Sequence, residues 1–185
     1  MTYLLALLAM IAAPLVAAQP GSPAAGGPYQ EISWEALVPK EWDPARHFRN
    51  IDLGSLKDGD PKAMEVLEIM KREWANAPID PSFNGRKVRI PGYVVPIEEK
   101  ERAITEFLLV PYYGACIHVP PPPANQIIHV ISAKPIKNLR VMDLVWVAGE
   151  IKAARYSANT PMGLSAAGYQ INSVAVTAYK EPMKK

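Results

Sequence analysis

The sequence has few of the residues that form disulfides or bind metals. One cysteine, Cys116, and three histidines occur in 185 residues. A single cysteine cannot form an internal disulfide, so this thiol is buried, metal-bound, reactive or paired with another chain. The formal net charge is only +2. Such a small excess gives no strong electrostatic attraction to nucleic acid or to an anionic membrane, and we expect neither as a partner.

The amino-terminal region contains no cysteine, and its first three residues include no lysine or arginine. Leu4 to Ala18 is an apolar run that Pro14 interrupts, and it is too short for a good membrane span. Small residues precede Gln19, as at the cleavage site of an export signal. We therefore expect a periplasmic protein that has no integral membrane span after cleavage and no amino-terminal cysteine for lipid attachment.

Patterns along the chain divide it into four parts. Residues 1–18 are the expected signal peptide, and residues 19–28 form a flexible linker rich in Pro, Gly and Ala. Residues 29–84 form an amino-terminal extension with a helix at about 61–75. Residues 85–180 form a β-barrel-like domain.

The helix has a clear start signal. Asp60 is a good N-cap, and Pro61 suits the first helical position. Apolar residues then recur at helical spacing. We expect this stripe to fill the core, and its members are Met64, Leu67, Met70 and Trp74.

Strand patterns dominate from residue 85 onward. Five strands are predicted, at 87–96, 105–113, 126–133, 143–156 and 168–179, with a loop of small residues at 159–167. The first strand bends at Pro91-Gly92, and Gly149 marks a bulge or tight bend in the fourth. The fold class is therefore mainly β, with a five-stranded OB-like barrel and one amino-terminal helix. A β-sandwich is the alternative.

One segment, Gly114 to Gln126, gathers most of the chemically particular residues. If its chain is extended, Cys116 and His118 lie on the same side of the backbone. Thiolate and imidazole are both good zinc ligands, and His129 in the third strand either joins them or faces the core. The proline run that follows is expected to be a stiff polyproline arm ending in two amides. Its members are Pro120, Pro121, Pro122, Pro123, Asn125 and Gln126.

Three other interpretations of this segment stay open. In a structural role, Cys116 is buried, His118 bonds to backbone, and the amides satisfy backbone groups that the prolines leave unpaired. In a catalytic role, Cys116, His118 and Asn125 form a cysteine-hydrolase constellation. This role is disfavoured, since no oxyanion-hole signature accompanies it, and we expect no enzyme. As a third option, the exposed prolines dock into an aromatic groove on a partner.

Several stretches together resemble the bacterial family catalogued as domain of unknown function 3299. The stretches are Ile32–Pro39, Val88–Pro96, Thr105–Tyr112, Gly114–Gln126 and Gly168-Tyr169. The resemblance implies an exported or lipid-anchored envelope protein. It also implies envelope ABC-type transporter components as partners, with a link to zinc supply. This sequence differs from the lipoprotein members in lacking the amino-terminal cysteine.

Overall fold

The computed structural model describes residues 28–46, 48–52, 54, 56–57, 59–100, 103–115, 121–160 and 163–180. The elements are β1 (Gln30–Glu31), η1 (Glu35–Leu37), α1 (Pro61–Ala75), η3 (Pro81–Phe83), β2 (Arg86–Lys100), β3 (Ala103–Val110), η4 (Ala124–Gln126), β4 (Ile128–Lys137), β5 (Leu144–Thr160) and β6 (Gly163–Ala178). The predicted signal peptide lies outside the described residues.

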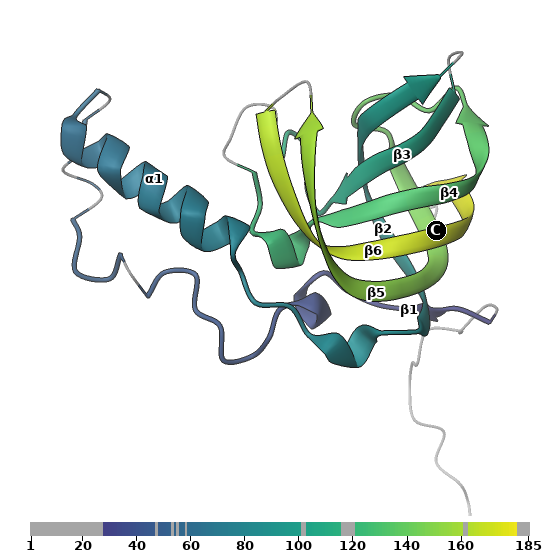
Figure 1. Cartoon of the computed structure of the whole chain (residues 1–185), viewed down its shortest axis with the longest axis horizontal. Helices are drawn as coiled ribbons and strands as arrows, with labels where there is room; N and C mark the ends of the chain where they lie inside the picture. The colour runs from purple at the N-terminus through teal and green to yellow at the C-terminus, as the bar shows by residue number, and fades with distance from the viewer. Residues whose placement is uncertain are drawn as a thin grey trace, which may run out of the picture.

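Strands β2 to β6 close into a five-stranded barrel (Figure 1). The strand order is β2-β3-β4-β6-β5, and β5 pairs again with β2. Strands β4 and β6 run parallel, whereas the other neighbouring strands of the barrel run antiparallel. The mainly β fold and the five-stranded OB-like barrel are thereby confirmed. The short β1 adds a parallel pairing to β2.

Strand β2 changes its partner at the predicted bend. Its residues up to Tyr93 pair with β5, and those from Tyr93 onward pair with β3. A Cβ at Gly92 would lie 2.7 Å from the Leu109 side chain and 2.9 Å from the Val110 carbonyl oxygen. Because no side chain fits at these distances, glycine lets β2 and β3 approach closely where the strand turns.

Buried side chains form two clusters, one inside the barrel and one on the outer side of β3. Phe107 and Leu109 belong to the first cluster, whereas Leu108 and Val110 belong to the second. Successive strand residues point to opposite faces, so β3 is buried on both. The outer cluster is completed from other segments by Val95, Ala115, Ile127, Met142 and Ala167. Thus Ala115, Ile127 and Met142, together with Ala167 of the β5–β6 hairpin, cover the outer face of β3.

Strands β5 and β6 are longer than the sequence predicts. A loop was expected at 159–167, but this prediction was wrong, since strand pairing continues to Thr160 opposite Gly163. The extra length is stabilised where Ala167 packs into the outer cluster. The predicted irregularity at Gly149 is confirmed, because the register of β5 against β6 shifts there.

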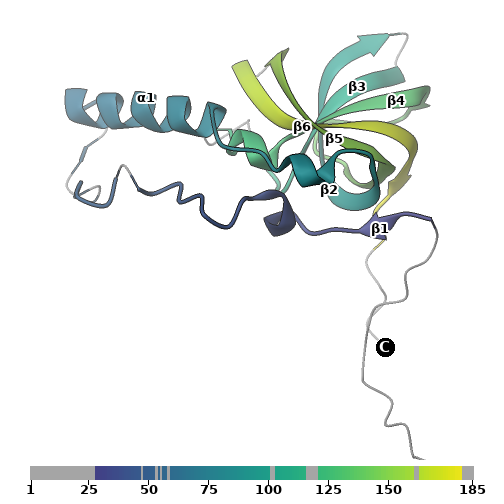
Figure 2. The same cartoon turned by 60° about the horizontal axis from the view of Figure 1, so that its bottom comes forward.

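Helix α1 begins where the sequence predicts, but it packs differently. Asp60 accepts a hydrogen bond from the Lys62 N–H at 2.8 Å, and Pro61 occupies the first turn. No residue of α1 is buried, and Met64 is 62% exposed. The expectation of core filling was therefore wrong for Met64, and it holds only in part for the half-buried Leu67, Met70 and Trp74. Both views show α1 extending away from the barrel, beyond reach of its interior (Figures 1 and 2).

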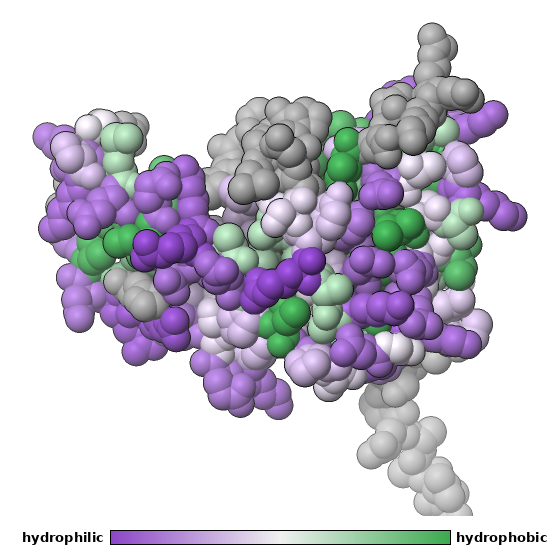
Figure 3. Space-filling view, in the orientation of Figure 1, coloured by the Kyte–Doolittle hydropathy of each residue, from purple (hydrophilic) through white to green (hydrophobic). Residues whose placement is uncertain are grey.

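The surface around α1 mixes charged and apolar side chains, with hydrophobic patches among hydrophilic ones (Figure 3). Within the described ranges, no helix is long and apolar enough to cross a lipid bilayer.

Side chains of β5 and β6 fasten the amino-terminal extension to the barrel. Tyr169 is fully buried, and its hydroxyl donates to the Leu37 carbonyl and accepts from the Asp80 N–H, both at 2.7 Å. Arg155 caps the carboxyl-terminal end of α1, where the last backbone carbonyls have no hydrogen-bond partner within the helix. It donates to the carbonyls of Ala75, Asn76 and Ala77. The division into a 29–84 extension and an 85–180 domain remains a prediction, although these contacts cross it.

Replacing Tyr169 with phenylalanine tests how much this attachment contributes. Tyr169→Phe keeps the ring and leaves the Leu37 carbonyl and the Asp80 N–H without their partner. We expect the free energy of unfolding in urea to fall by about 1–3 kcal/mol. Tyr113→Phe, at a residue that is 70% exposed, is the control and should change it by less than about 0.5 kcal/mol. Equal stability of the two variants would contradict the assignment.

The same hydroxyl should make stability sensitive to alkaline pH. Burial raises the pKa of Tyr169 above its ordinary value. The unfolded chain therefore loses this proton first, at about pH 10. Stability from the neutral hydroxyl is complete below that pH and is lost as pH rises through the folded-state pKa. Urea titrations above pH 10 should show a steeper decline for the natural protein than for Tyr169→Phe, and parallel declines would refute the linkage.

Candidate functional site

The predicted site segment divides into a part outside the described residues and a part within them. Cys116, His118 and Pro120 lie outside. Directly before this undescribed stretch, Ala115 is fully buried in the outer cluster. Gly114 has φ +82°, in the left-handed region that favours glycine. The chain therefore enters the segment through a turn that ends in a buried residue.

The described end of the proline run is built into the fold. Pro122 is buried, whereas Pro121 and Pro123 are half-buried. Pro123 has φ −55° and ψ 148°, close to polyproline II geometry, as predicted. A docking ligand for an aromatic groove would need exposed prolines. The burial of Pro122 favours the rigid arm over the docking ligand for this part of the run.

The two amides after the prolines have different environments. Asn125 is fully buried, and its Nδ2 donates to the Pro78 carbonyl at 3.1 Å. Its Oδ1 has no hydrogen-bond partner among the described residues. Gln126 is half-buried, and its backbone N–H donates to the Pro123 carbonyl at 2.7 Å. Asn125 thus satisfies a carbonyl of the extension, whereas a group within the proline run was expected.

Gly168, in the Gly-Tyr pair of β6, has a steric role beside this segment. A Cβ there would lie 2.5 Å from Cγ2 of Ile79 and 2.7 Å from the Ala124 carbonyl oxygen. Only glycine lets the extension, η4 and β6 meet at this point. The glycine therefore helps to hold Ala124, near the end of the 114–126 segment, which we call the Cys-His-Pro segment.

His129 is the one predicted metal ligand that the structure describes. It lies between Ile128 and Val130, which both belong to the barrel interior, so its side chain points to the outer face. In the strand register, His129 is opposite Leu108 of the outer cluster. His129 therefore points away from the barrel interior, and it is buried on the outer side of the barrel.

The ring of His129 is held on two sides. Its Nε2 lies 3.1 Å from Oε2 of Glu106, and the ring stacks on Tyr156 at 3.8 Å with an interplanar angle of 8°. His129 is only 3% exposed, and its Nδ1 has no hydrogen-bond partner among the described residues. Since a carboxylate only accepts, Nε2 donates to Glu106, and in the neutral form of the ring the lone pair lies at Nδ1.

This arrangement fits a metal ligand with its supporting carboxylate. Metal-bound histidines usually donate their second ring nitrogen to a carboxylate or carbonyl, which orients the ring. Within the described ranges, no three histidine, cysteine, aspartate or glutamate side chains gather closely enough to hold a metal. A complete site therefore needs donors from outside those ranges, where Cys116 and His118 lie.

The covering of the outer face limits what else can bind there. In OB-like barrels, the second and third strands commonly carry the oligonucleotide or oligosaccharide site. These strands are β3 and β4 here, and Leu108 and Val110 are fully buried beneath other parts of the same chain. A nucleic-acid strand requires an open groove with accessible aromatic side chains. This face does not offer such a groove at Leu108 and Val110.

The sequence analysis did not predict the roles of two tyrosines: Tyr156, which stacks on His129, and Tyr169, which attaches the extension to the barrel. Tyr156 lies on β5 directly after a register shift between Ala153 and Tyr156, and it stacks on His129. No sequence signal marks this shift. Tyr169 was noticed only as part of a family motif, although a tyrosine in an otherwise apolar strand can signal a buried hydroxyl with partners.

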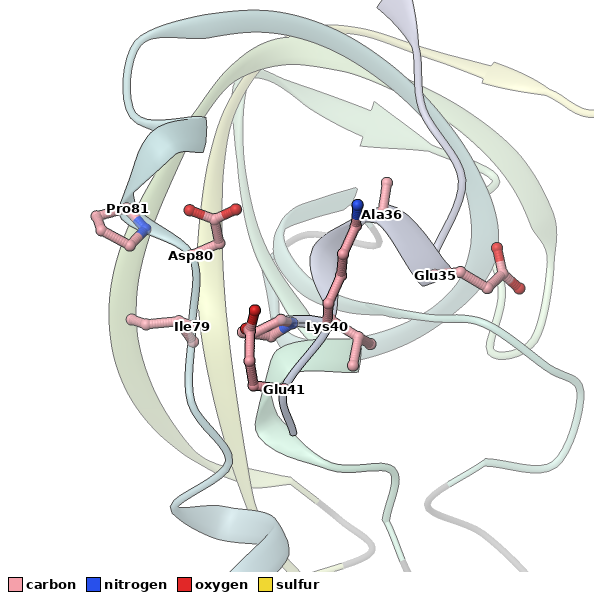
Figure 4. A pocket seen from close by; sticks show the side chains of 9 residues that line it. Glu35, Ala36, Lys40, Glu41, Ile79, Asp80 and Pro81 are labelled. Atoms are coloured by element: carbon pink, nitrogen blue, oxygen red, sulfur yellow. The ribbon is translucent and has the colours of Figure 1, made fainter. Parts of the chain in front are cut away.

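A hollow of about 480 Å³ lies between η1 and the 79–81 segment. Figure 4 shows Asp80 at one side with Ile79 and Pro81, Lys40 and Glu41 in the middle, and Glu35 at the far side. The Asp80 carboxylate already accepts from the Ser82 N–H at 2.8 Å, and this hydrogen bond lowers its pKa. The charged groups do not converge, so this hollow is a weaker candidate than the His129 site.

The buried amide permits a direct test of the structural part of the segment. Asn125→Ala removes the donor to the Pro78 carbonyl, and we expect the free energy of unfolding to fall by about 1–3 kcal/mol. Gln126→Ala, at the half-buried neighbour, should cost less than about 0.5 kcal/mol. Chemical denaturation of both variants gives the comparison. A larger loss for Gln126→Ala would contradict the assignment of Asn125.

Comparison with known proteins identifies relatives of unassigned function. Residues 34–178 match the sequence model described as "Protein of unknown function (DUF3299)". A crystal structure of a DUF3299 family protein from Pseudomonas aeruginosa PAO1 is 35% identical, with a TM-score of 0.63. The similarity covers 84% of this chain and 99% of that one. A search of curated proteins gave no match. The chain is a member of the DUF3299 family.

Proposed function

We propose that the protein is a periplasmic accessory protein that binds a transition metal, preferably zinc, at His129, Cys116 and His118. The observation that carries the proposal is His129, which is buried, bonded to Glu106 through Nε2 and unpartnered at Nδ1 among the described residues. Imidazole and thiolate together suit zinc. In this assignment Nδ1 of His129 is the ligand atom and Glu106 orients the ring.

The position of His129 supports the choice of the other two ligands. Cys116 directly follows Ala115, which is buried in the same outer cluster as Leu108, the residue opposite His129. The segment that carries the thiol therefore begins on the face where the His129 side chain points. Three protein ligands leave a fourth tetrahedral position for water or for a donor from a partner. Such an open site suits transfer of the metal better than its permanent storage.

The accessory role rests on the family resemblance and on the predicted export. An envelope ABC-type transporter for zinc is the partner class that these features imply. A strain lacking the protein should then grow normally when zinc is plentiful and more slowly than its parent when zinc is chelated.

A second candidate function, a non-enzymatic interaction or structural module, is favoured by the described half of the segment. Pro122 and Asn125 are buried, and Asn125 is bonded to the extension. On this view Cys116 and His118 are structural too, and the segment is a rigid crossover between β3 and β4. The two candidates differ in whether Nδ1 of His129 binds a metal.

Calorimetric titration of the reduced protein with zinc distinguishes them. We expect binding at about micromolar affinity or tighter, and its loss in Cys116→Ser, His118→Ala and His129→Ala. Glu106→Gln keeps a similar shape but weakens the orienting hydrogen bond, and it should reduce affinity about 10- to 100-fold.

His47→Ala removes the third histidine of the chain and is the matched control, which should bind zinc like the natural protein. Absence of binding, or binding that is indifferent to His129→Ala, would refute the metal site and leave the structural module.

A further inference from the structure

The part of the extension around α1 has an incompletely covered apolar layer. Of the described residues from 38 to 76, none is buried. This stretch nevertheless contains many apolar side chains that are only half-buried, namely Trp42, Phe48, Ile51, Leu56, Val66, Leu67, Ile69, Met70 and Trp74. Apolar surface left in this state gains free energy when a partner covers it.

One side of α1 is the most open part of this layer. At 100° per residue, Met64, Leu67, Glu68 and Lys71 share a side of the helix, and we call them the Met64 face. Met64 is 62% exposed. Glu68 and Lys71 form an ion pair at 2.9 Å, and their side chains are 71% and 48% exposed. Arg46 of the preceding segment contacts α1 elsewhere, through Glu73.

The acidic and basic residues of the Met64 face can pair with those of the same face on a second copy of the helix. In an antiparallel pair of identical helices, a two-fold axis passing between positions 69 and 70 sets Glu68 of each helix opposite Lys71 of the other. The same axis sets Met64 opposite Ala75 and Leu67 opposite Arg72 of the second helix. The projection of α1 away from the barrel leaves room for this approach (Figures 1 and 2).

We propose that the Met64 face of α1 pairs antiparallel with the same face of a second copy, giving a two-fold symmetric dimer. This inference is independent of the metal site. A membrane surface is a poorer occupant, because helices that lie on anionic lipid carry a basic polar face. Here three acidic residues, Glu65, Glu68 and Glu73, balance three basic ones, Lys62, Lys71 and Arg72.

Charge-reversal variants in sedimentation equilibrium give a sharp test. The natural protein should show twice the mass of one chain. Glu68→Lys alone and Lys71→Glu alone each place like charges opposite each other, and each should shift the protein to the monomer. An equimolar mixture of the two variants restores both cross-pairs and should dimerise again. An ion pair within one helix cannot produce this rescue, since neither variant regains it on mixing.

Two further variants examine the apolar part of the face. Met64→Glu should give a monomer, whereas Glu65→Lys, one residue and about 100° further round the helix, should remain a dimer. Circular dichroism establishes that each variant is folded. A monomeric natural protein at about 100 μM, a mixture that stays monomeric, or a dimer that survives Met64→Glu would each overturn the proposal.

Discussion

The hydroxyl of Tyr169 couples the amino-terminal extension to the barrel. A buried hydroxyl is costly unless it is hydrogen-bonded, and here both partners are backbone groups of the extension. The donor bond positions the end of η1 at Leu37. The accepted bond positions Asp80, whose carboxylate in turn caps η3 through Ser82. The Phe83 ring of that turn then meets the Tyr169 ring edge-on at 6.0 Å. One side chain of β6 therefore orders two separate turns.

The same part of the extension also contacts the described end of the Cys-His-Pro segment, at Ala124 and Asn125. Asn125 bonds to Pro78, and Gly168 lets Ile79 and Ala124 come together beside Tyr169. At the other end, Ala115 is buried in the outer cluster. Both ends of the 116–120 stretch are thus joined to packed parts of the protein. This explains why one long motif contains residues suited to packing and residues suited to chemistry.

Local signals predicted much of the fold, and long-range contacts decided the rest. The Asp60-Pro61 start of α1, the bend at Gly92 and the irregularity at Gly149 each follow from the preferences of one or two residues. Periodicity cannot tell whether an apolar stripe is covered, so the exposure of Met64 was not predictable. The small residues at 159–167 are compatible with a loop or with strands. In the structure, Ala167 belongs to β6 and packs into the outer cluster, and strand pairing continues to Thr160 opposite Gly163.

The candidate site shows the same limit. Sequence alone offered His129 two orientations, and the register of β4 against β3 selected the outer face. A histidine buried for packing alone is expected to satisfy both ring nitrogens, since an unpaired polar atom in the interior is costly. The described residues satisfy only Nε2. The partner of Nδ1 must therefore come from beyond them: from an undescribed side chain, from water or from a bound metal. In the proposed metal site, zinc would be that partner, and Glu106 would orient the ring from the opposite nitrogen.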